Sequence, residues 1–302
     1  MRPVEWRLRD TTLDTGDHTL VMGVLNVTPD SFSDGGLSFD TDAAVAKGLR
    51  LADEGADVVD VGGESTRPYA DPVSVGDEIS RVVPVVAALA ESGVIVSVDT
   101  RKPEVAAAAL EAGAQIVNDV TALGTDGMAE VCRSAGAAVV LMHMQGTPGT
   151  MQDAPAYRDV VAEVGEFLVE RATAAEAAGV GRDQICLDPG IGFGKTLEHN
   201  LVLLGHLPSL VDLGYPVLLG ASRKAFLGAI LESAGHRIEA AGRDTATAAT
   251  TTLAIASGVA VVRVHDVAGT LQVARVADAI VRHSSEAGSR QPPRVRRRVP
   301  ES

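Results

Sequence analysis

A set of polar and charged side chains stands at the ends of short apolar runs. Its members are Asn26, Asp99, Asn118, Asp188, Lys224, Arg263 and His265. Each one by itself is compatible with a strand cap or an ordinary salt bridge. Their repeated position is harder to explain in that way, because loops that return to solvent need no such concentration of polar groups at strand ends. We therefore interpret them as parts of one shared site.

Cationic groups predict that this site takes an anionic substrate. Arg67, Arg263 and His265 stand out in a chain whose formal net charge is −14, and arginine side chains grip phosphate oxygens with a planar fork of donors. Asn26 offers a neutral oxygen, which fits Mg²⁺ held mainly by substrate phosphates and water. No cluster of His, Asp and Glu has the spacing of a dedicated metal site, so zinc is disfavoured.

Acceptors and donors in the same set predict a flat heterocyclic ligand. Asp99, Asn118 and Asp188 supply acceptors, and Asn118 and Lys224 supply donors. A carboxylate that faces two adjacent N–H groups matches the amino-pyrimidinone edge of a pterin or a guanine. Buried acceptors without such donors would cost about 1–3 kcal/mol each. This chemistry does not distinguish a pterin from a guanine.

Two long connections are candidates for mobile lids over the site. Residues 28–39 and 64–72 are rich in Gly, Ser, Asp and Pro, a composition typical of such loops. An ordinary surface connection is the alternative. Phe32 and Arg67 are unusual choices for plain linkers, so we favour a functional role.

The elements that must position these residues form a repeating pattern of apolar runs. The eight runs are residues 20–25, 58–61, 95–98, 116–117, 137–142, 185–187, 217–219 and 259–264. Stretches of helical composition separate them, and one of these begins with the N-cap spacing of Ser74 and Asp77. A glycine stands shortly before most of the later runs, as at the end of a helix: Gly55, Gly93, Gly113, Gly136, Gly179, Gly214 and Gly258.

Eight strand–helix alternations predict an α/β fold, a (β/α)8 TIM barrel, with the polar strand ends on its active face. An open, doubly wound sheet is the alternative. Residues 6–13, Gly16-Asp17 and residues 19–25 predict an N-terminal β-hairpin that leads into the first barrel strand and closes the barrel bottom.

Composition favours a single barrel domain over residues 1–282. The chain has 302 residues with 46% hydrophobic and 3% aromatic residues, which predicts a core of Val, Ile, Leu and Ala. Residues 283–302 are rich in Arg and Pro, so we expect a disordered tail; contact of that tail with RNA or a membrane is less favoured. The net charge of −14 argues against nucleic-acid or membrane partners for the domain.

Cysteine usage and the N-terminal residues bear on the compartment. Cys132 and Cys186 lack the number and spacing of a disulfide framework or a metal site, so we expect both to be plain buried residues. The N-terminal residues have no apolar leader segment, and no run of about 20 apolar residues occurs. We therefore expect a cytoplasmic location.

Several sequence motifs resemble those of the dihydropteroate synthase family. The two longest are residues 22–36, MGVLNVTPDSFSDGG, and residues 62–68, GGESTRP. Shorter matches follow in order: 97–100 (SVDT), 117–119 (VND), 141–146 (LMHMQG), 187–195 (LDPGIGFGK), 222–224 (SRK) and 263–266 (RVHD). The resemblance extends from about residue 20 to residue 282, and the two long motifs are specific.

The resemblance implies a homodimeric, Mg²⁺-dependent transferase of folate biosynthesis. Such an enzyme condenses 6-hydroxymethyl-7,8-dihydropterin pyrophosphate with p-aminobenzoate and is a target of sulfonamides. The implied pterin-binding residues are Asp99, Asn118, Val120, Met142, Asp188, Phe193, Gly220, Lys224 and Arg263. The implied pyrophosphate-binding residues are Asn26, Arg67, Arg263 and His265, with Asn26 also holding the metal. The implied p-aminobenzoate-binding residues are Phe32, Thr66, Arg67, Pro68, Phe193, Ser222 and Lys224. The implied catalytic residues are Asp34, Arg67, Asp99, Lys224 and Arg263.

One departure and two rival functions accompany the resemblance. Tyr69 follows Pro68 where the family usually has glycine, which bears on sulfonamide affinity more than on the reaction. A catalytically silent paralogue that acts as a binding protein is one rival. A pterin-binding methyltransferase domain is the other, although it has no need of a pyrophosphate group. Small apolar helix faces within residues 245–257 and 271–281 could form a dimer interface or simply pack on the barrel.

Overall fold

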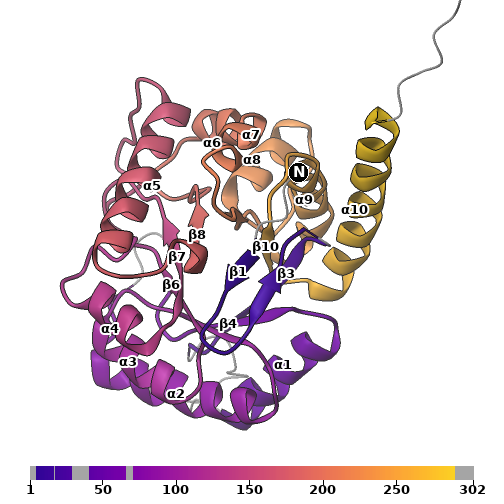
Figure 1. Ribbon diagram of the computed structural model, residues 1–302. Helices are drawn as coiled ribbons and strands as arrows, with labels where there is room; N and C mark the ends of the chain where they lie inside the picture. Colours follow the sequence, from indigo (N-terminus) through magenta and orange to yellow (C-terminus); the bar gives the residue numbers. More distant parts are fainter. Residues whose placement is uncertain (1–4, 17, 29–40, 66–70, 290–302) are drawn as a thin grey trace, which may run out of the picture.

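In the described part of the chain, eight parallel strands close into a barrel (Figure 1). The computed structural model describes residues 5–16, 18–28, 41–65 and 71–289. The sheet order is β8-β7-β6-β5-β4-β3-β10-β9, and a parallel bridge between Leu187 and Val217 joins its two ends. The barrel prediction is therefore confirmed, and the open sheet is excluded. The strands are β3 (Leu20–Asn26), β4 (Val58–Gly62), β5 (Val96–Asp99), β6 (Ile116–Asp119), β7 (Ala138–Met142), β8 (Ile185–Asp188), β9 (Leu218–Leu219) and β10 (Val261–Val264).

Helices surround the barrel as an outer ring (Figure 1). They are α1 (Thr41–Asp53), α2 (Val75–Glu91), α3 (Pro103–Glu111), α4 (Met128–Ala135), α5 (Val160–Ala177), α6 (Leu197–Gly205), α7 (Leu207–Val211), α8 (Ala225–Ser233), α9 (Asp244–Ala256) and α10 (Val267–Ser289), with short 3₁₀ turns η2 (Arg182–Gln184) and η3 (Ala240–Gly242). The expected cap is present, since Ser74 accepts a hydrogen bond from the Asp77 amide at 3.1 Å. The glycines expected at helix ends all have positive φ, for example 100° at Gly55, a conformation that glycine adopts without strain.

Apolar side chains form two separate clusters on the two faces of the barrel wall. Side chains such as Val21, Val59 and Leu141 belong to the larger cluster, which also contains buried helix residues and so fills the space between strands and helices. Alternate positions, such as Met22 and Val140, belong to a smaller cluster inside the barrel. Both faces of each strand are thus apolar, as expected for a buried parallel sheet.

The N-terminal hairpin closes the bottom of the barrel, as the sequence predicts. Strands β1 (Glu5–Arg7) and β2 (Thr12–Asp14) pair antiparallel. Trp6 is fully buried in the interior cluster, and its indole N–H donates to the Gln184 carbonyl at 3.0 Å. The turn differs from the prediction, because it lies between Leu8 and Thr11, whose backbone groups are hydrogen-bonded at 2.8 Å, and not at Gly16.

The last helix extends beyond the expected start of the tail at residue 283. Helix α10 continues to Ser289, because no proline interrupts the chain before Pro292. Residues 290–302 lie outside the described residues, so a disordered tail there stays a prediction. Cys132 and Cys186 are both buried free thiols, as expected. Among the described helices, none is long and apolar enough to span a membrane.

Candidate active site

The strand ends that the sequence singles out lie side by side at one rim of the barrel. Asn26 on β3 is in register with Gly62 on β4, Gly62 with Asp99 on β5, and Asp99 with Asn118 on β6. Across the barrel, Asp188 on β8 is in register with Met142 on β7. Because all barrel strands are parallel, their carboxyl ends share this rim, which is the usual location of the active site in such barrels.

A buried ionic network crosses the barrel mouth between four strands. The Arg263 guanidinium donates to Asp60 Oδ2 at 2.6 Å and to Asp99 Oδ2 at 2.7 Å. Asn118 Nδ2 donates to the same Asp60 oxygen at 3.1 Å. Burial raises the pKa of Asp99, and the positive charge of Arg263 opposes this shift. For Arg263, attraction to Asp60 and Asp99 outweighs burial, so its pKa is raised and it stays charged.

Asp60 is a site residue that the sequence motifs did not identify. It lies within β4, its side chain is fully buried, and it holds both Arg263 and Asn118. Among the described residues, its second oxygen, Oδ1, has no hydrogen-bond partner. The sequence signal for Asp60 is a carboxylate inside an otherwise apolar strand. A charge is rarely buried there without a partner, so its presence indicates a buried ion pair. In the sequence, Asp60 interrupts the apolar run 58–61.

Asp188 and Lys224 form the opposite side of the mouth. Asp188 Oδ1 accepts a hydrogen bond from the Gly190 amide at 2.7 Å. Burial raises the pKa of Asp188, although that amide and the charge of Lys224 oppose the shift. Burial lowers the pKa of Lys224 to about 8, and its ammonium lies 3.9 Å from the centre of the Phe193 ring. The backbone of Gly220 lies beside this side of the mouth, since a Cβ there would stand 3.9 Å from Asp188 Oδ2 and 4.0 Å from Arg263 Cβ, at ordinary contact distance.

Beneath the Phe193 segment lies a buried lysine that sequence reasoning left without a role. Lys195 Nζ contacts His143 Nδ1 at 2.9 Å and donates to the carbonyls of Gly190 and Phe193, each at 3.0 Å. Burial lowers the pKa of Lys195 to about 7 and that of His143 to about 3. The histidine is therefore neutral at physiological pH. Lys195 fixes the backbone that carries Phe193 beside Lys224.

The other predicted residues divide into those that the structure places and those outside the described residues. Ser222 Oγ lies 3.0 Å from His265 Nδ1 and accepts a hydrogen bond from the His265 amide at 3.2 Å. Val120 and Met142 are buried near the ends of β6 and β7. Outside the described residues lie Phe32, Asp34, Thr66, Arg67, Pro68 and Tyr69.

The amide oxygen at the rim fits a divalent cation that is coordinated mainly by phosphate oxygens and water. Within the described ranges, no group of three or more His, Cys, Asp or Glu side chains could hold a metal. Asn26 carries a partly exposed, neutral amide oxygen at the end of β3. One such ligand suits Mg²⁺, which usually keeps several waters and relies on phosphate oxygens. The residues present therefore fit Mg²⁺ bound together with a diphosphate.

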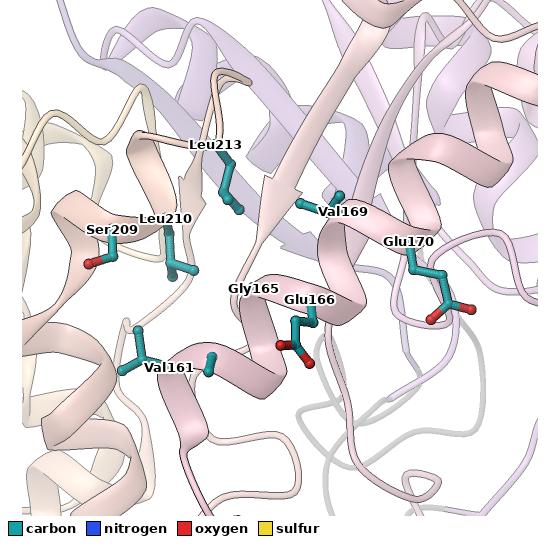
Figure 2. A pocket seen from close by; sticks show the side chains of 9 residues that line it. Val161, Gly165, Glu166, Val169, Glu170, Ser209, Leu210 and Leu213 are labelled. Carbon is teal, nitrogen blue, oxygen red and sulfur yellow. The ribbon is translucent and has the colours of Figure 1, made fainter.

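A separate surface hollow of about 530 Å³ lies on the outer ring between α5 and α7 (Figure 2). Its lining is mostly apolar, with side chains such as Val161, Leu210 and Leu213, and Glu166 and Glu170 stand at its edge. These helices lie outside the barrel mouth, so the hollow belongs to a different part of the molecule from the ionic network.

Comparison with known proteins identifies the family of the chain and agrees with its fold. Residues 22–265 match the pterin binding enzyme family. A dihydropteroate synthase of Mycobacterium leprae is 50% identical over 262 residues, which are 86% of this chain and 92% of the relative. A dihydropteroate synthase of Escherichia coli K12 is 44% identical over 270 residues, which are 89% and 94% of the two chains.

Solved structures give the same result. The dihydropteroate synthase of Xanthomonas albilineans with 4-aminobenzoic acid has a TM-score of 0.85 at 48% identity and covers 92% of this chain and 98% of that one. The structure of that synthase in complex with 7,8-dihydropteroate has a TM-score of 0.81 at 45% identity, with 91% and 98% covered. The chain therefore belongs to the pterin binding enzymes and, within them, to the dihydropteroate synthase family.

Proposed function

We propose that this chain is a transferase that condenses 6-hydroxymethyl-7,8-dihydropterin pyrophosphate with p-aminobenzoate, giving 7,8-dihydropteroate and pyrophosphate. The observation that carries the proposal is the grouping of acceptors and donors around Arg263 at the barrel mouth. Arg263 binds Asp99 directly, and the charges of Arg263, Asp99 and Asp188 all act on Lys224. Relatives of this chain include a synthase solved with dihydropteroate, which supports the assignment.

In this proposal the pterin lies across the mouth, between the two acid-bearing sides. Asp188 Oδ1 is occupied by the Gly190 amide, so Oδ2 accepts from the amino-pyrimidinone edge. Asp99 and Asn118 bind the ring from the other side, where Asp60 holds the Asn118 amide in a fixed orientation. Lys224 donates to the ring, and Arg263 covers its face and contacts phosphate. Val120, Met142, Phe193 and Gly220 line the pocket.

The p-aminobenzoate lies beside Phe193, Lys224 and Ser222 in the proposal. The hydrogen bond between Ser222 and His265 connects this half of the site with the diphosphate half. Phe32, Thr66, Arg67 and Pro68 complete the aminobenzoate side, and Asp34 assists the reaction. These residues come from the two connections that we expect to exclude water. This part of the proposal is based on the sequence motifs, because all five residues lie outside the described structure.

The diphosphate is held by Asn26, Arg67, Arg263 and His265. Mg²⁺, when bound with the diphosphate at Asn26, would neutralise charge that develops on the diphosphate oxygens. The C–O bond between the pterin methylene and the diphosphate breaks, and its electron pair leaves with the diphosphate. The resulting cation is delocalised into the dihydropterin ring, where Asp99 and Asp188 supply nearby negative charge. The aryl amine then forms the N–C bond and releases a proton to solvent.

The two rival functions are less well supported. A methyltransferase domain has no need of the diphosphate group formed by Asn26, Arg67 and His265. A catalytically silent paralogue is disfavoured because the matched positions are intact in the sequence, and those within the described residues converge at the rim. A single assay separates the three functions. Purified protein is mixed with both substrates and MgCl₂, and dihydropteroate and pyrophosphate are measured.

The three functions predict different results in this assay. The synthase makes both products, loses activity with a chelator and regains it when Mg²⁺ is added. A silent paralogue binds the pterin without turnover. A methyltransferase domain leaves the diphosphate ester intact. Absence of dihydropteroate at any Mg²⁺ concentration would overturn the proposed function.

We also propose a homodimer and a cytoplasmic location. Large apolar side chains are exposed on the neighbouring helices α9 and α10, with Leu253 63% and Val276 and Ile280 each 62% accessible. Association of two copies through these helices would remove this surface from water. The buried free thiols of Cys132 and Cys186 agree with a reducing compartment.

A further inference from the structure

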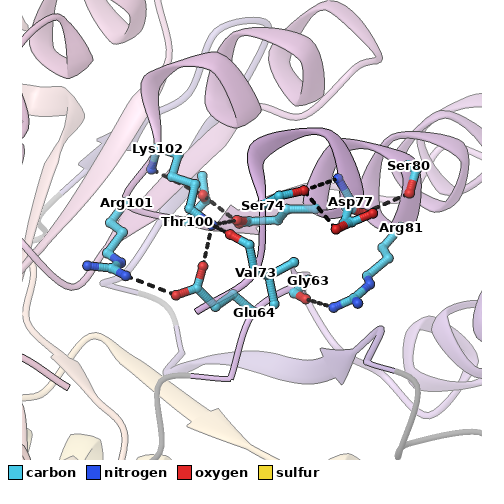
Figure 3. A network of polar contacts seen from close by, with 11 residues as sticks. Gly63, Glu64, Val73, Ser74, Asp77, Ser80, Arg81, Thr100, Arg101 and Lys102 are labelled. Atoms are coloured by element: carbon cyan, nitrogen blue, oxygen red, sulfur yellow. Dashed lines mark hydrogen bonds and ion pairs between the residues drawn. The ribbon is translucent and has the colours of Figure 1, made fainter. Parts of the chain in front are cut away.

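Two polar networks follow the carboxyl ends of barrel strands. One surrounds Lys102, whose ammonium pairs with Glu64 and Glu78 (Figure 3). Along the chain, Glu64 closely precedes residues 66–70, which lie outside the described residues. The other network holds the turn between β9 and α8, and all of its residues belong to the described structure. That turn carries Ser222 and Lys224, two residues of the candidate site.

The turn passes through a backbone conformation that glycine adopts more easily than any other residue. Its central residue, Arg223, has a φ of 59°, in the left-handed region. A side chain crowds the backbone there, so a residue other than glycine persists only where the surroundings fix it. Arg223 lies between Ser222 and Lys224, so the directions of both side chains depend on this conformation.

The N-terminus of α9 holds Arg223 by its side chain and by its backbone. Asp244, the first residue of α9, accepts hydrogen bonds from Arg223 Nε at 2.7 Å and from Arg223 Nη2 at 2.8 Å. Such a bidentate pair fixes the direction of the guanidinium as well as its distance. Thr247 Oγ1, also on α9, accepts a hydrogen bond from the Arg223 amide at 3.1 Å. One helix end therefore fixes both parts of Arg223.

A third contact comes from Arg243, the N-cap residue of α9. Its Nη1 donates to the Arg223 carbonyl at 3.2 Å and to the Lys224 carbonyl at 3.4 Å. Gly228 on α8 leaves the space for this guanidinium, since a Cβ there would lie 2.7 Å from Arg243 Cζ. Arg243 thus connects the start of α9 with the start of α8. We call Arg243, Asp244 and Thr247 the α9 clamp.

The turn sets the point from which the Lys224 side chain begins. Lys224 is the N-cap residue of α8, and its ammonium lies 3.9 Å from the centre of the Phe193 ring. Its side chain also passes close to Gly192, where a Cβ would lie 3.2 Å from Lys224 Cδ. A rotation of the backbone at Arg223 would move the Lys224 Cα and take the ammonium away from these contacts. The place of the ammonium at the barrel mouth therefore depends on the conformation of Arg223.

We propose that Arg223, held by the α9 clamp, is a positioning residue for Lys224 and thereby for pterin binding. The inference rests on the proposed function. The guanidinium of Arg223 binds α9, so its effect on the ligand is transmitted through the turn. The ion pair with Asp244 offsets the strain of the left-handed conformation. Without the pair, the turn relaxes toward a negative φ and Lys224 is displaced.

The test compares Arg223→Ala with Arg223→Gly. Arg223 itself is replaced because the charge of Asp266 also acts on it and could compensate for the loss of Asp244. Both variants lose the ion pair, but only alanine is strained by a positive φ. Calorimetry with 6-hydroxymethylpterin should give a Kd about tenfold higher in Arg223→Ala and less than about threefold higher in Arg223→Gly. The matched control is Arg133→Ala, which removes an exposed arginine from an ion pair on α4 and should bind like the wild type (Figure 1).

A double-mutant cycle tests whether Arg223 acts through Lys224. Lys224→Met removes the ammonium and should itself weaken pterin binding. If Arg223 only positions that ammonium, Arg223→Ala/Lys224→Met should bind as weakly as Lys224→Met, within about twofold. General damage to the fold would instead add the two losses. The cycle therefore gives a result that a purely structural role of Arg223 does not produce.

A second site keeps the inference testable if Arg223→Ala does not fold. Gly228→Ala places a Cβ against the Arg243 guanidinium, which must move away from the Arg223 and Lys224 carbonyls. Alanine is a better helix former than glycine, so the Tm should stay equal or rise. We expect pterin binding to weaken by about threefold in this variant.

The possible results separate the inference from the proposed function. A wild-type protein that neither binds 6-hydroxymethylpterin nor makes dihydropteroate refutes the function. With an active wild type, normal pterin binding by Arg223→Ala refutes the inference, as does normal binding by Gly228→Ala where Arg223→Ala does not fold. Equal losses in Arg223→Ala and Arg223→Gly, or additive losses in the double variant, also refute it.

Discussion

Replacement of Asp188 by asparagine separates the binding role of its charge from its effect on stability. The Gly190 amide donates to Asp188 Oδ1 at 2.7 Å and therefore requires an acceptor at that position. In Asp188→Asn the amide oxygen must take this place, which turns the NH₂ group to the position of Oδ2. In the proposed function, Oδ2 is the atom that accepts from the pterin edge. The substitution thus presents a donor where the pterin edge also presents donors.

The size of the effect follows from the single acceptor that is lost. A hydrogen bond to a charged group contributes about 1.5–3 kcal/mol. Each 1.4 kcal/mol changes an equilibrium constant by about tenfold, so we expect pterin affinity to fall by about 10- to 150-fold. Stability should behave differently. Because burial raises the pKa of Asp188, the folded protein disfavours its charged form, and the neutral asparagine should leave the free energy of unfolding unchanged or higher.

Two measurements on the same preparation test this reasoning. Isothermal calorimetry with a non-hydrolysable pterin analogue gives the dissociation constant, and urea unfolding gives the stability. Asp183→Asn is the matched control. Asp183 is an exposed acid that pairs with Arg7, and it lies in η2 just before β8, at the end of the strand opposite to Asp188. An affinity within about threefold of the wild type would remove Asp188 from the pterin site. A large loss of stability would instead assign the residue a mainly structural role.

Three further predictions concern buried charges and the surface. Asp60→Ala should lower the free energy of unfolding in urea by about 3–5 kcal/mol, because Arg263 and Asn118 lose a buried partner, and Asp60→Asn should cost clearly less; equal costs would contradict this. Lys195 has a folded pKa of about 7 against an ordinary value of 10.5, so unfolded chains bind more protons between these values. As the pH rises between these two values, the free energy of unfolding of the wild type should therefore increase by up to about 1.4 kcal/mol per pH unit relative to Lys195→Met. Parallel curves of unfolding free energy against pH would refute the lowered pKa of Lys195. Leu253→Asp should give a monomer in sedimentation analysis, whereas the control Val169→Asp on α5 should leave a dimer; a monomeric wild type would exclude the proposed interface.

The order of the elements and the rim residues could be predicted from the sequence. Apolar runs, helix-ending glycines and the Ser74 cap are local signals, because backbone geometry and burial act over a few neighbouring residues. Once eight such units close into a barrel, the ends of all parallel strands must share one rim. Asp99, Asn118 and Asp188 therefore converge without any knowledge of their individual contacts.

The partners of the buried charges were decided only by the tertiary structure. Asp60 pairs with Arg263, which is 203 positions away, and Lys195 meets His143 across 52 positions. Lys102 joins Glu64 to Glu78 although each acid could equally have faced solvent. A sequence shows which residues carry charge, but the energy of a buried charge depends on which group lies within hydrogen-bonding distance, and chain folding alone sets that distance.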